Sequence, residues 1–358
     1  MKLKDIAYQR LNNQSVAGQT STDATEVVRH LVAVQAQDYL GSLWAVGLRI
    51  KNATEPDIEN ALNNRQIVRT WPMRGTLHFV AAEDARWMLP LLTPRVIVRT
   101  ATIYKQAGLD NKIFLKAKKI IVKALEQRKV LTRTELYDVL EDARIDTADQ
   151  RGLHILGYLA QEGLICFGGR KGKQQTFVLL DEWLPKSHSL TREESLYQLA
   201  KRYFASHGPA TRNDFAWWSG LGPGDVNSAL AMIKTEVTVF ALEKREFWTI
   251  GDQQPIKSER GIYLLPAYDE YTVAYKDRSA ILDPAHVQKA RNGIFGPVVI
   301  VNSQIAGTWS RTITNDKVSI QIKSFIKLQS VQAGRLQKKV KEYCRFIGKS
   351  LANLSINH

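Results

Sequence analysis

The stretch DQRGLHILGYLAQEGLICFGGRKGKQQTFVLL, residues 149–180, joins a helical pattern to a hairpin pattern. Its first half is amphipathic through Leu153, Leu156 and Leu159, and Gly163 stands where a helix C-cap is expected. The second half has two apolar runs around a glycine-rich basic turn, which predicts a β-hairpin. A helix followed by such a hairpin is typical of the end of a winged-helix domain, a helix-turn-helix that carries a β-hairpin wing.

The residues before this stretch supply the missing helices. KIFLKAKKIIVKALEQR, residues 112–128, has apolar residues close to helical spacing. TRTELYDVLEDA begins with Thr132 and has Glu135 three positions later, which is a capping-box pattern. The chain from about 113 to 180 therefore predicts one complete winged-helix domain.

The same plan recurs elsewhere in the chain. A second copy is predicted from about 193 to 250, and a less regular copy at the N-terminus has a first helix at about 24–35 and a hairpin at 66–80. From about residue 253 the pattern changes to strand-like alternation, and residues 330–351 should close the chain as a helix. The predicted fold class is α+β, with tandem winged-helix domains and a C-terminal β-rich domain. The predicted boundaries are 1–112 for an N-terminal winged-helix domain that contains Gln-Ala-Gln, 113–186 and 187–252 for the second and third winged-helix domains, and 253–358 for the β-rich domain with its basic C-terminal helix.

The composition indicates a polyanionic partner. The 358 residues include 50 Lys and Arg against 35 Asp and Glu, for a formal charge of +15 and a pI near 9.7. This excess favours nucleic acid first and an anionic membrane second, with a solvated basic surface as the alternative. Residues 317–349 are especially basic, with Glu342 as the one acid. No apolar run approaches the ~18 residues of a membrane-spanning helix. No signal peptide is evident, and Cys166 and Cys344 are too few for a disulfide framework, so we expect a reduced, cytoplasmic setting.

The turn of the 149–180 hairpin carries three cations, Arg170, Lys171 and Lys173. Glycines let a backbone approach a ligand closely, and flanking cations can meet phosphates. We therefore predict DNA-phosphate contacts at this wing tip. A hairpin turn that is merely soluble remains the alternative.

Most catalytic and cofactor motifs are absent from the sequence. It contains no Walker loop, no dinucleotide fingerprint, no G-x-S-x-G and no H-E-x-x-H, and its seven histidines show no metal-ligand spacing, so we expect neither a metal nor a cofactor. Asp269 and Glu270 interrupt the apolar stretch LLPAYDEYTVAY and form a candidate additional site. A cationic partner such as Arg278 is the favoured explanation for this acidic pair.

Two glutamines, Gln35 and Gln37, interrupt an apolar run in HLVAVQAQDYLGSLWAVGLR, residues 30–49. One explanation is a helix end whose polar tips face water. On a continuous helix, side chains two positions apart point about 200° from each other. Both amides can converge on one target only if the first helix ends near Gln35 and leaves Gln37 in extended backbone.

Four segments together resemble one known family. VQAQD, RTWPMRGTLHFV, LLPAYDEYTVAYKDR and GIFGPVVIVNSQIAGTWSR look like the winged-helix family that contains the AlkZ-type and YcaQ-type DNA glycosylases, and the resemblance extends from about residue 5 to 350. It implies tandem winged helices around a concave basic surface, a barrel-like C-terminal element and excision of alkylated purines from DNA. The AlkZ type carries Gln-aliphatic-Gln, which falls on Gln35, Ala36 and Gln37. The YcaQ type has Asp at the second polar position, and Asp38 lies one residue too late for that role.

The resemblance implies a monofunctional glycosylase that acts on duplex DNA. The oligomeric state is open, with a monomer as the default expectation. Gln35 and Gln37 would orient water against the sugar of a cationic N7- or N3-alkylated purine, and the absence of a lysine nucleophile implies no lyase activity. Arg74 and His78, in the predicted 66–80 hairpin, could reach the phosphates or the lesion, with a structural hairpin as the alternative. Two other readings stay open: a non-catalytic winged-helix DNA binder or transcription regulator, and a module that binds RNA or a membrane surface.

Overall fold

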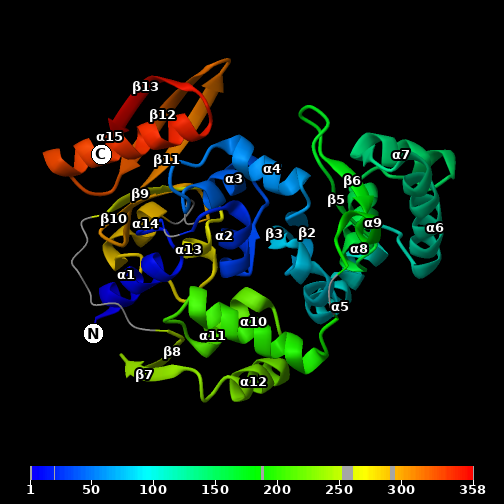
Figure 1. The fold of residues 1–358 in the computed structure, drawn as a ribbon, viewed down its shortest axis with the longest axis horizontal. Helices are drawn as coiled ribbons and strands as arrows, with labels where there is room; N and C mark the ends of the chain where they lie inside the picture. Colours follow the sequence, from blue (N-terminus) through cyan, green and yellow to red (C-terminus); the bar gives the residue numbers. More distant parts are fainter. Residues whose placement is uncertain (1, 20, 187–188, 252–260, 291–294, 358) are drawn as a thin grey trace. The chain divides into compact units, whose positions relative to one another are not determined.

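The computed structural model describes residues 2–19, 21–186, 189–251, 261–290 and 295–357. The chain has a mixed α+β fold and forms two compact units, each made of separate chain segments (Figure 1). The first unit comprises residues 1–58, 197–218 and 222–358, and the second comprises 59–196 and 219–221. The predicted boundaries after residues 186 and 252 fall beside residues outside the described ranges, and the division into four domains stays a prediction. No helix in the described ranges is long and apolar enough to cross a membrane.

The first unit begins with short helices and a short strand. These are α1 (Leu3–Asn13), α2 (Ala24–Leu31), β1 (Ala33–Gln35) and α3 (Tyr39–Gly47). Asp23 caps the N-terminus of α2, because its carboxylate accepts a hydrogen bond from the backbone N–H of Glu26. Helix α3 is apolar almost throughout, which fits its buried position.

The middle of the chain adds a second group of elements to the first unit. They are α11 (Arg212–Ser219, mostly in this unit), α12 (Pro223–Met232) and the antiparallel pair β7 (Thr238–Leu242) and β8 (Arg245–Thr249). Helix α12 begins directly after Gly222, so the turn GLGPGDV opens a helix. Helices α4 (Glu55–Asn63) and α10 (Arg192–Ser206) each run from one unit into the other.

The C-terminal part of the first unit is an open five-stranded sheet in the order β13-β12-β11-β10-β9. Its strands are β9 (Ile262–Leu265), β10 (Val298–Val301), β11 (Gln304–Thr314), β12 (Lys317–Ser324) and β13 (Ser350–Asn357). Strand β13 pairs parallel to β12 because α15 (Ser330–Phe346) crosses over between them. This crossover places β13 at an edge of the sheet and leaves β9 at the other edge. The sheet is therefore not closed, and the prediction of a barrel-like element was wrong. The remaining short helices are α13 (Glu270–Val273), the 3-10 turn Pro284–His286 and α14 (Val287–Ala290).

The second unit begins with a hairpin and continues with helices. Strands β2 (Ile67–Met73) and β3 (Thr76–Ala81) are antiparallel, and they agree with the hairpin predicted at 66–80. Then follow α5 (Ala82–Gln106), α6 (Asn111–Arg128), β4 (Leu131–Thr132), α7 (Arg133–Asp142), α8 (Arg151–Gln161), β5 (Ile165–Phe167), β6 (Thr176–Leu179) and α9 (Leu180–Trp183). The capping box predicted at the start of α7 is present, because Thr132 and Glu135 exchange backbone and side-chain hydrogen bonds.

One apolar core holds the second unit together. Helices α6, α7 and α8 and the β4-β6-β5 sheet enclose it, and the buried residues include Ile121, Leu136, Leu156 and Phe177. Trp71 of β2 belongs to the same core, where its ring lies 5.0 Å from that of Phe167. The three helices and the hairpin predicted for residues 113–180 are all present, and the hairpin turn projects beyond this core (Figure 1).

Candidate active site

The segment that carries Gln35 and Gln37 is a short extended connection between α2 and α3. Helix α2 ends at Leu31, and Val32 follows with a φ of 68°, in the left-handed region that a β-branched residue rarely adopts. This residue turns the chain into β1, which ends at Gln35, and Gln37 lies in the bend just before α3. The prediction that the first helix reaches Gln35 was therefore wrong by four residues, although Gln37 does lie outside the helix.

The two glutamines differ in exposure. Gln35 is buried, with 8% of its surface exposed, whereas Gln37 is exposed. An amide can donate and accept hydrogen bonds simultaneously but takes no proton at neutral pH. This chemistry suits residues that position a water molecule, and it excludes either glutamine as a general base.

A buried carboxylate fixes the backbone of this segment. The backbone N–H of Gln35 donates to Oε1 of Glu270, at 2.9 Å, and the indole N–H of Trp218 donates to Oε2 at the same distance. Glu270 is fully buried at the start of α13, 235 residues along the chain from Gln35. The two N–H donors offset part of the free-energy cost of burying the carboxylate. The hydrogen bond with Gln35 fixes the position of the Gln35 backbone at the end of β1.

His207 lies beside the same carboxylate, near the oxygen that accepts from Trp218. Its Nε2 is 3.5 Å from Oε2 of Glu270, its Nδ1 is 2.8 Å from Oγ of Ser206, and its ring stacks on Tyr203. Burial lowers the pKa of His207 because the charged form is desolvated, and the nearby Glu270 opposes this effect only in part. His207 is therefore neutral at pH 7.

The neutral state of His207 predicts how stability depends on pH. The unfolded side chain binds a proton near the ordinary histidine pKa of 6.5, whereas the folded one does so only at lower pH. The free energy of unfolding should therefore fall as the pH is lowered from about 7.5 to about 5.5. Urea unfolding at the two pH values should show a smaller fall for His207→Gln than for the unmodified protein. Equal pH dependence in both proteins would contradict this assignment.

Asp269, next to Glu270, has a partner of its own. Its two carboxylate oxygens accept from the guanidinium of Arg49 at 2.8 and 3.0 Å, and both side chains are fully buried. The sequence had favoured a cationic partner such as Arg278. A cationic partner is present, but it is Arg49, whereas the guanidinium of Arg278 donates to the backbone oxygen of Thr272. Asp269 and Glu270 thus meet different partners, and both link distant parts of the first unit.

The β2–β3 hairpin carries Arg74 and His78 in the second unit. Arg74 and Gly75 form its two-residue loop, with φ values of 56° and 75°, and both residues require the left-handed region. The guanidinium of Arg74 lies 3.1 Å from Nε2 of His78, whose Nδ1 is 3.0 Å from the backbone oxygen of Thr76. A guanidinium can only donate, so Nε2 accepts and Nδ1 carries the proton. His78 is fully buried and supports the hairpin, whereas Arg74 is half-buried.

The three cations of the β5–β6 hairpin turn differ in their exposure to solvent. Arg170 forms an ion pair with Glu59, at 2.6 Å, and is partly buried. Lys171 and Lys173 are exposed on either side of Gly172, and 75% of the Lys171 side chain is accessible. A hollow of about 440 Å³ in the same unit is lined by Lys173 and two further cations, Arg69 and Arg133. The wing tip therefore presents two lysines to solvent, whereas Arg170 is held by its ion pair with Glu59.

The sequence of this chain matches a known family of DNA repair enzymes. The family described as DNA glycosylase AlkZ-like matches residues 28–346, and the chain belongs to this family. Its members are DNA-binding glycosylases, and the resemblance seen in the sequence is thereby confirmed.

Two comparisons relate the chain to the bacterium Streptomyces sahachiroi. The chain is 25% identical over 319 residues to a curated protein named interstrand DNA cross-link repair glycosylase, and the match covers 84% of this chain and 85% of that protein. The structure of this chain is similar to that of S. sahachiroi DNA glycosylase AlkZ, with a TM-score of 0.82. The match has 21% sequence identity and covers 99% of each chain. The structural likeness extends the shared fold to nearly the whole chain.

The sequence alone did not identify every residue around the glutamines. The sequence did not predict that three further residues contact the acidic pair. They are Arg49, which contacts Asp269, and Trp218 and His207, which contact Glu270. The signal that existed was the acidic pair itself, in an apolar stretch where charge must be compensated. Among the described residues, no group of three or more His, Cys, Asp or Glu side chains could hold a metal ion.

Proposed function

We propose that this protein is a monofunctional DNA glycosylase that hydrolyses the N-glycosidic bond of N7- or N3-alkylated purines in duplex DNA. The observation that carries the proposal is the Gln35–Gln37 segment: two uncharged amides on a connection whose backbone is held by the buried carboxylate of Glu270. A fixed backbone with one exposed amide suits the orientation of a water molecule and the lesion nucleotide.

Neutral amides suffice because the leaving group is already activated. An alkylated N7 or N3 makes the purine cationic, so the electrons of the C1′–N9 bond neutralise that charge as the bond breaks. The sugar becomes oxocarbenium-like, water adds to C1′ and then releases its proton to solvent. The protein has to position the water and stabilise the developing charge on the sugar. An unmodified adenine or guanine is a poor leaving group, and the same site should leave it intact.

No covalent intermediate with the sugar is proposed, so no lyase activity is expected. The proposed site contains amides rather than an amine, so no Schiff base with the sugar is expected. The carboxylate of Glu270 is fully buried and engaged by two N–H donors, so we assign it to positioning Gln35 rather than to attack on the sugar.

We propose that the winged-helix elements bind the DNA. We assign residues 111–179 to a winged-helix module, with Lys171 and Lys173 contacting phosphates and Arg170 bracing the wing through Glu59. Arg74 is assigned to the phosphates or the lesion, and His78 to the support of Arg74. We further propose that the protein acts as a monomer in the cytoplasm.

The function is tested with duplex DNA that contains 7-methylguanine. Incubation with the protein should release the free base, and the strand should break only after alkali, because an abasic site is left intact. Strand cleavage without alkali would contradict the monofunctional assignment. A protein that binds one defined DNA sequence and releases no base would instead be a non-catalytic regulator.

The wing assignment predicts a selective loss of DNA affinity. Lys171→Ala combined with Lys173→Ala should weaken binding to all duplex sequences alike, and the slope of log affinity against log salt should decrease by about one for each phosphate that is no longer neutralised. The rate of base release at saturating enzyme should stay unchanged. Lys118→Ala with Lys119→Ala, exposed positions on α6, is the matched control. If this control weakens binding equally, the loss reflects net charge rather than the wing.

A further inference from the structure

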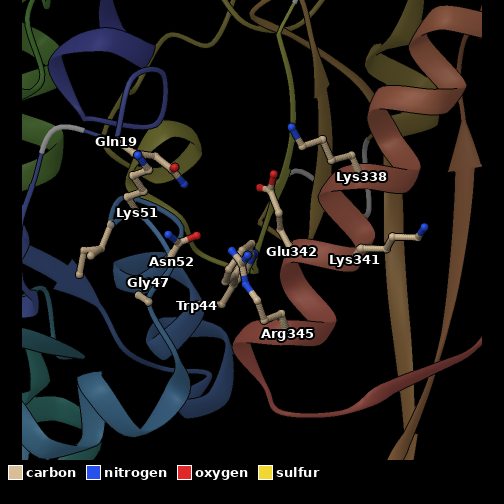
Figure 2. Close-up of a pocket in the computed structure, with 11 residues that line it drawn as sticks. Gln19, Trp44, Gly47, Lys51, Asn52, Lys338, Lys341, Glu342 and Arg345 are labelled. Carbon is tan, nitrogen blue, oxygen red and sulfur yellow. The ribbon is translucent and has the colours of Figure 1, made fainter.

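A basic hollow lies along α15 in the first unit, in a part of the molecule that the proposed glycosylase site does not use. Two adjoining hollows of about 520 and 330 Å³ share Gln19, Lys338 and Glu342 in their walls. Figure 2 shows the larger one, with α15 on one side and the turn that bears Lys51 and Asn52 on the other. We call the two hollows together the α15 groove.

The sequence of α15 explains why one side of the helix is cationic. Leu336, Val340 and Tyr343 recur at helical spacing and are buried against the unit. Lysines and arginines fill positions between them, and those that line the groove are Arg335, Lys338, Lys339, Lys341 and Arg345. The opposite wall adds one cation, Lys51, and two neutral amides, those of Gln19 and Asn52.

Four of the cations that line the groove are not compensated by any carboxylate in the described ranges. Glu342 is the one carboxylate among the lining residues, and it is paired with Lys339 at 2.7 Å. Lys51, Lys338, Lys341 and Arg345 form no ion pair with any residue of the described ranges, and all four are exposed. Like charges gathered in this way repel one another, and an anionic ligand would relieve that repulsion.

The length of the groove indicates an extended polyanion rather than a single small anion. Lys338 and Arg345 are seven residues apart, which is about 10 Å along a helix, and Arg335 extends the row to about 15 Å. A single compact phosphate cannot contact both ends of such a row, whereas successive phosphates of one strand can. The neutral amides of Gln19 and Asn52 add donors that suit phosphate oxygens without adding charge.

We propose that the α15 groove binds the phosphodiester backbone of duplex DNA, as a contact separate from the wing and from the Gln35–Gln37 segment. This inference rests on the proposed function in taking duplex DNA as the ligand. The groove contacts no base, so it contributes affinity and orientation without sequence preference. It also gives the basic C-terminal helix a role that the composition of the chain had left unassigned.

The test replaces three cations of the groove with glutamine: Lys338→Gln, Lys341→Gln and Arg345→Gln together. Binding of an undamaged duplex, followed by fluorescence anisotropy over a range of salt concentrations, should weaken about tenfold or more, and the salt slope should fall by about two to three units. All three side chains are exposed, so unchanged thermal unfolding should confirm an intact fold.

A matched variant removes the same number of charges elsewhere in the first unit. Lys317, Lys323 and Lys327 are exposed, and none of them lines the groove, so their glutamine variants should bind DNA nearly as well as the unmodified protein. Equal losses in the two triple variants would show an effect of net charge and overturn the inference. A loss seen only with single-stranded RNA, with duplex binding unchanged, would overturn it as well.

Glu342→Gln gives a test in the opposite direction. It removes the one carboxylate that lines the groove, so duplex DNA should bind severalfold more tightly and with a steeper salt slope. Unchanged or weaker binding would contradict the inference. Because every readout here is binding to undamaged DNA, the groove can fail while base release by the unmodified protein still supports the proposed function, and the reverse outcome is equally distinguishable.

Discussion

Gln37→Ala should lower the single-turnover rate of 7-methylguanine release by about 100-fold to 1,000-fold while DNA affinity stays nearly unchanged. This magnitude follows from the usual effect of removing one group that positions a reactant or stabilises a transition state, about 3–4 kcal/mol. Gln37 is exposed and lies outside any helix or strand, so its truncation should leave the free energy of unfolding intact. The rate is measured as free base released by excess enzyme from a labelled duplex.

Gln321→Ala is the matched control for this experiment. Gln321 is an exposed glutamine of β12, and its truncation should change neither the rate nor the affinity. Gln35→Ala should reduce the rate as well, but Gln35 is buried, so its thermal unfolding must be followed in parallel. An unchanged rate in Gln37→Ala would remove the proposed role of the pair and favour a protein that binds DNA without altering it.

The local elements of the second unit could be predicted because the residues that determine them lie close together in the sequence. Thr132 and Glu135 cap α7 across three positions, and the β2–β3 hairpin turns over the two adjacent residues Arg74 and Gly75. In both cases a short segment contains the donor and the acceptor, or the turn and its flanking strands. Pattern alone therefore located these elements.

The end of α2 could not be predicted in this way. Val32, Ala33 and Val34 continue the apolar run of the helix, and nothing near them indicates a stop. The helix ends because Val32 adopts a left-handed conformation and Gln35 bonds to Glu270, 235 residues away. The partner of Asp269 was missed for the same reason, since Arg49 lies 220 residues from it. Such pairings depend on the tertiary fold, and one sequence does not reveal them.

Glu270→Gln should show how far the site depends on this distant contact. The two N–H donors of Gln35 and Trp218 bind different oxygens of the carboxylate. The amide of glutamine places an NH2 group where one of these oxygens stood, so one buried N–H loses its acceptor. We expect the free energy of unfolding to fall by about 2–4 kcal/mol. Urea unfolding monitored by tryptophan fluorescence measures this loss.

A purely structural role for Glu270 and a positioning role predict different kinetics. If Glu270 only stabilises the fold, every folded molecule is fully active, so the single-turnover rate constant of Glu270→Gln at saturating enzyme should be unchanged. If Glu270 sets the position of Gln35, the rate constant itself should fall about tenfold or more in the folded fraction, because a misplaced catalytic group loses its geometry.

The second unit offers a matched control for Glu270→Gln. Asp84 is also buried and accepts a hydrogen bond from a tryptophan indole, that of Trp87, at 2.9 Å. Asp84→Asn should destabilise the protein and leave the rate constant unchanged, since Asp84 has no part in holding Gln35. Should Glu270→Gln behave like Asp84→Asn, the carboxylate contributes to folding alone. The geometry of the Gln35–Gln37 segment would then have to be fixed by other contacts.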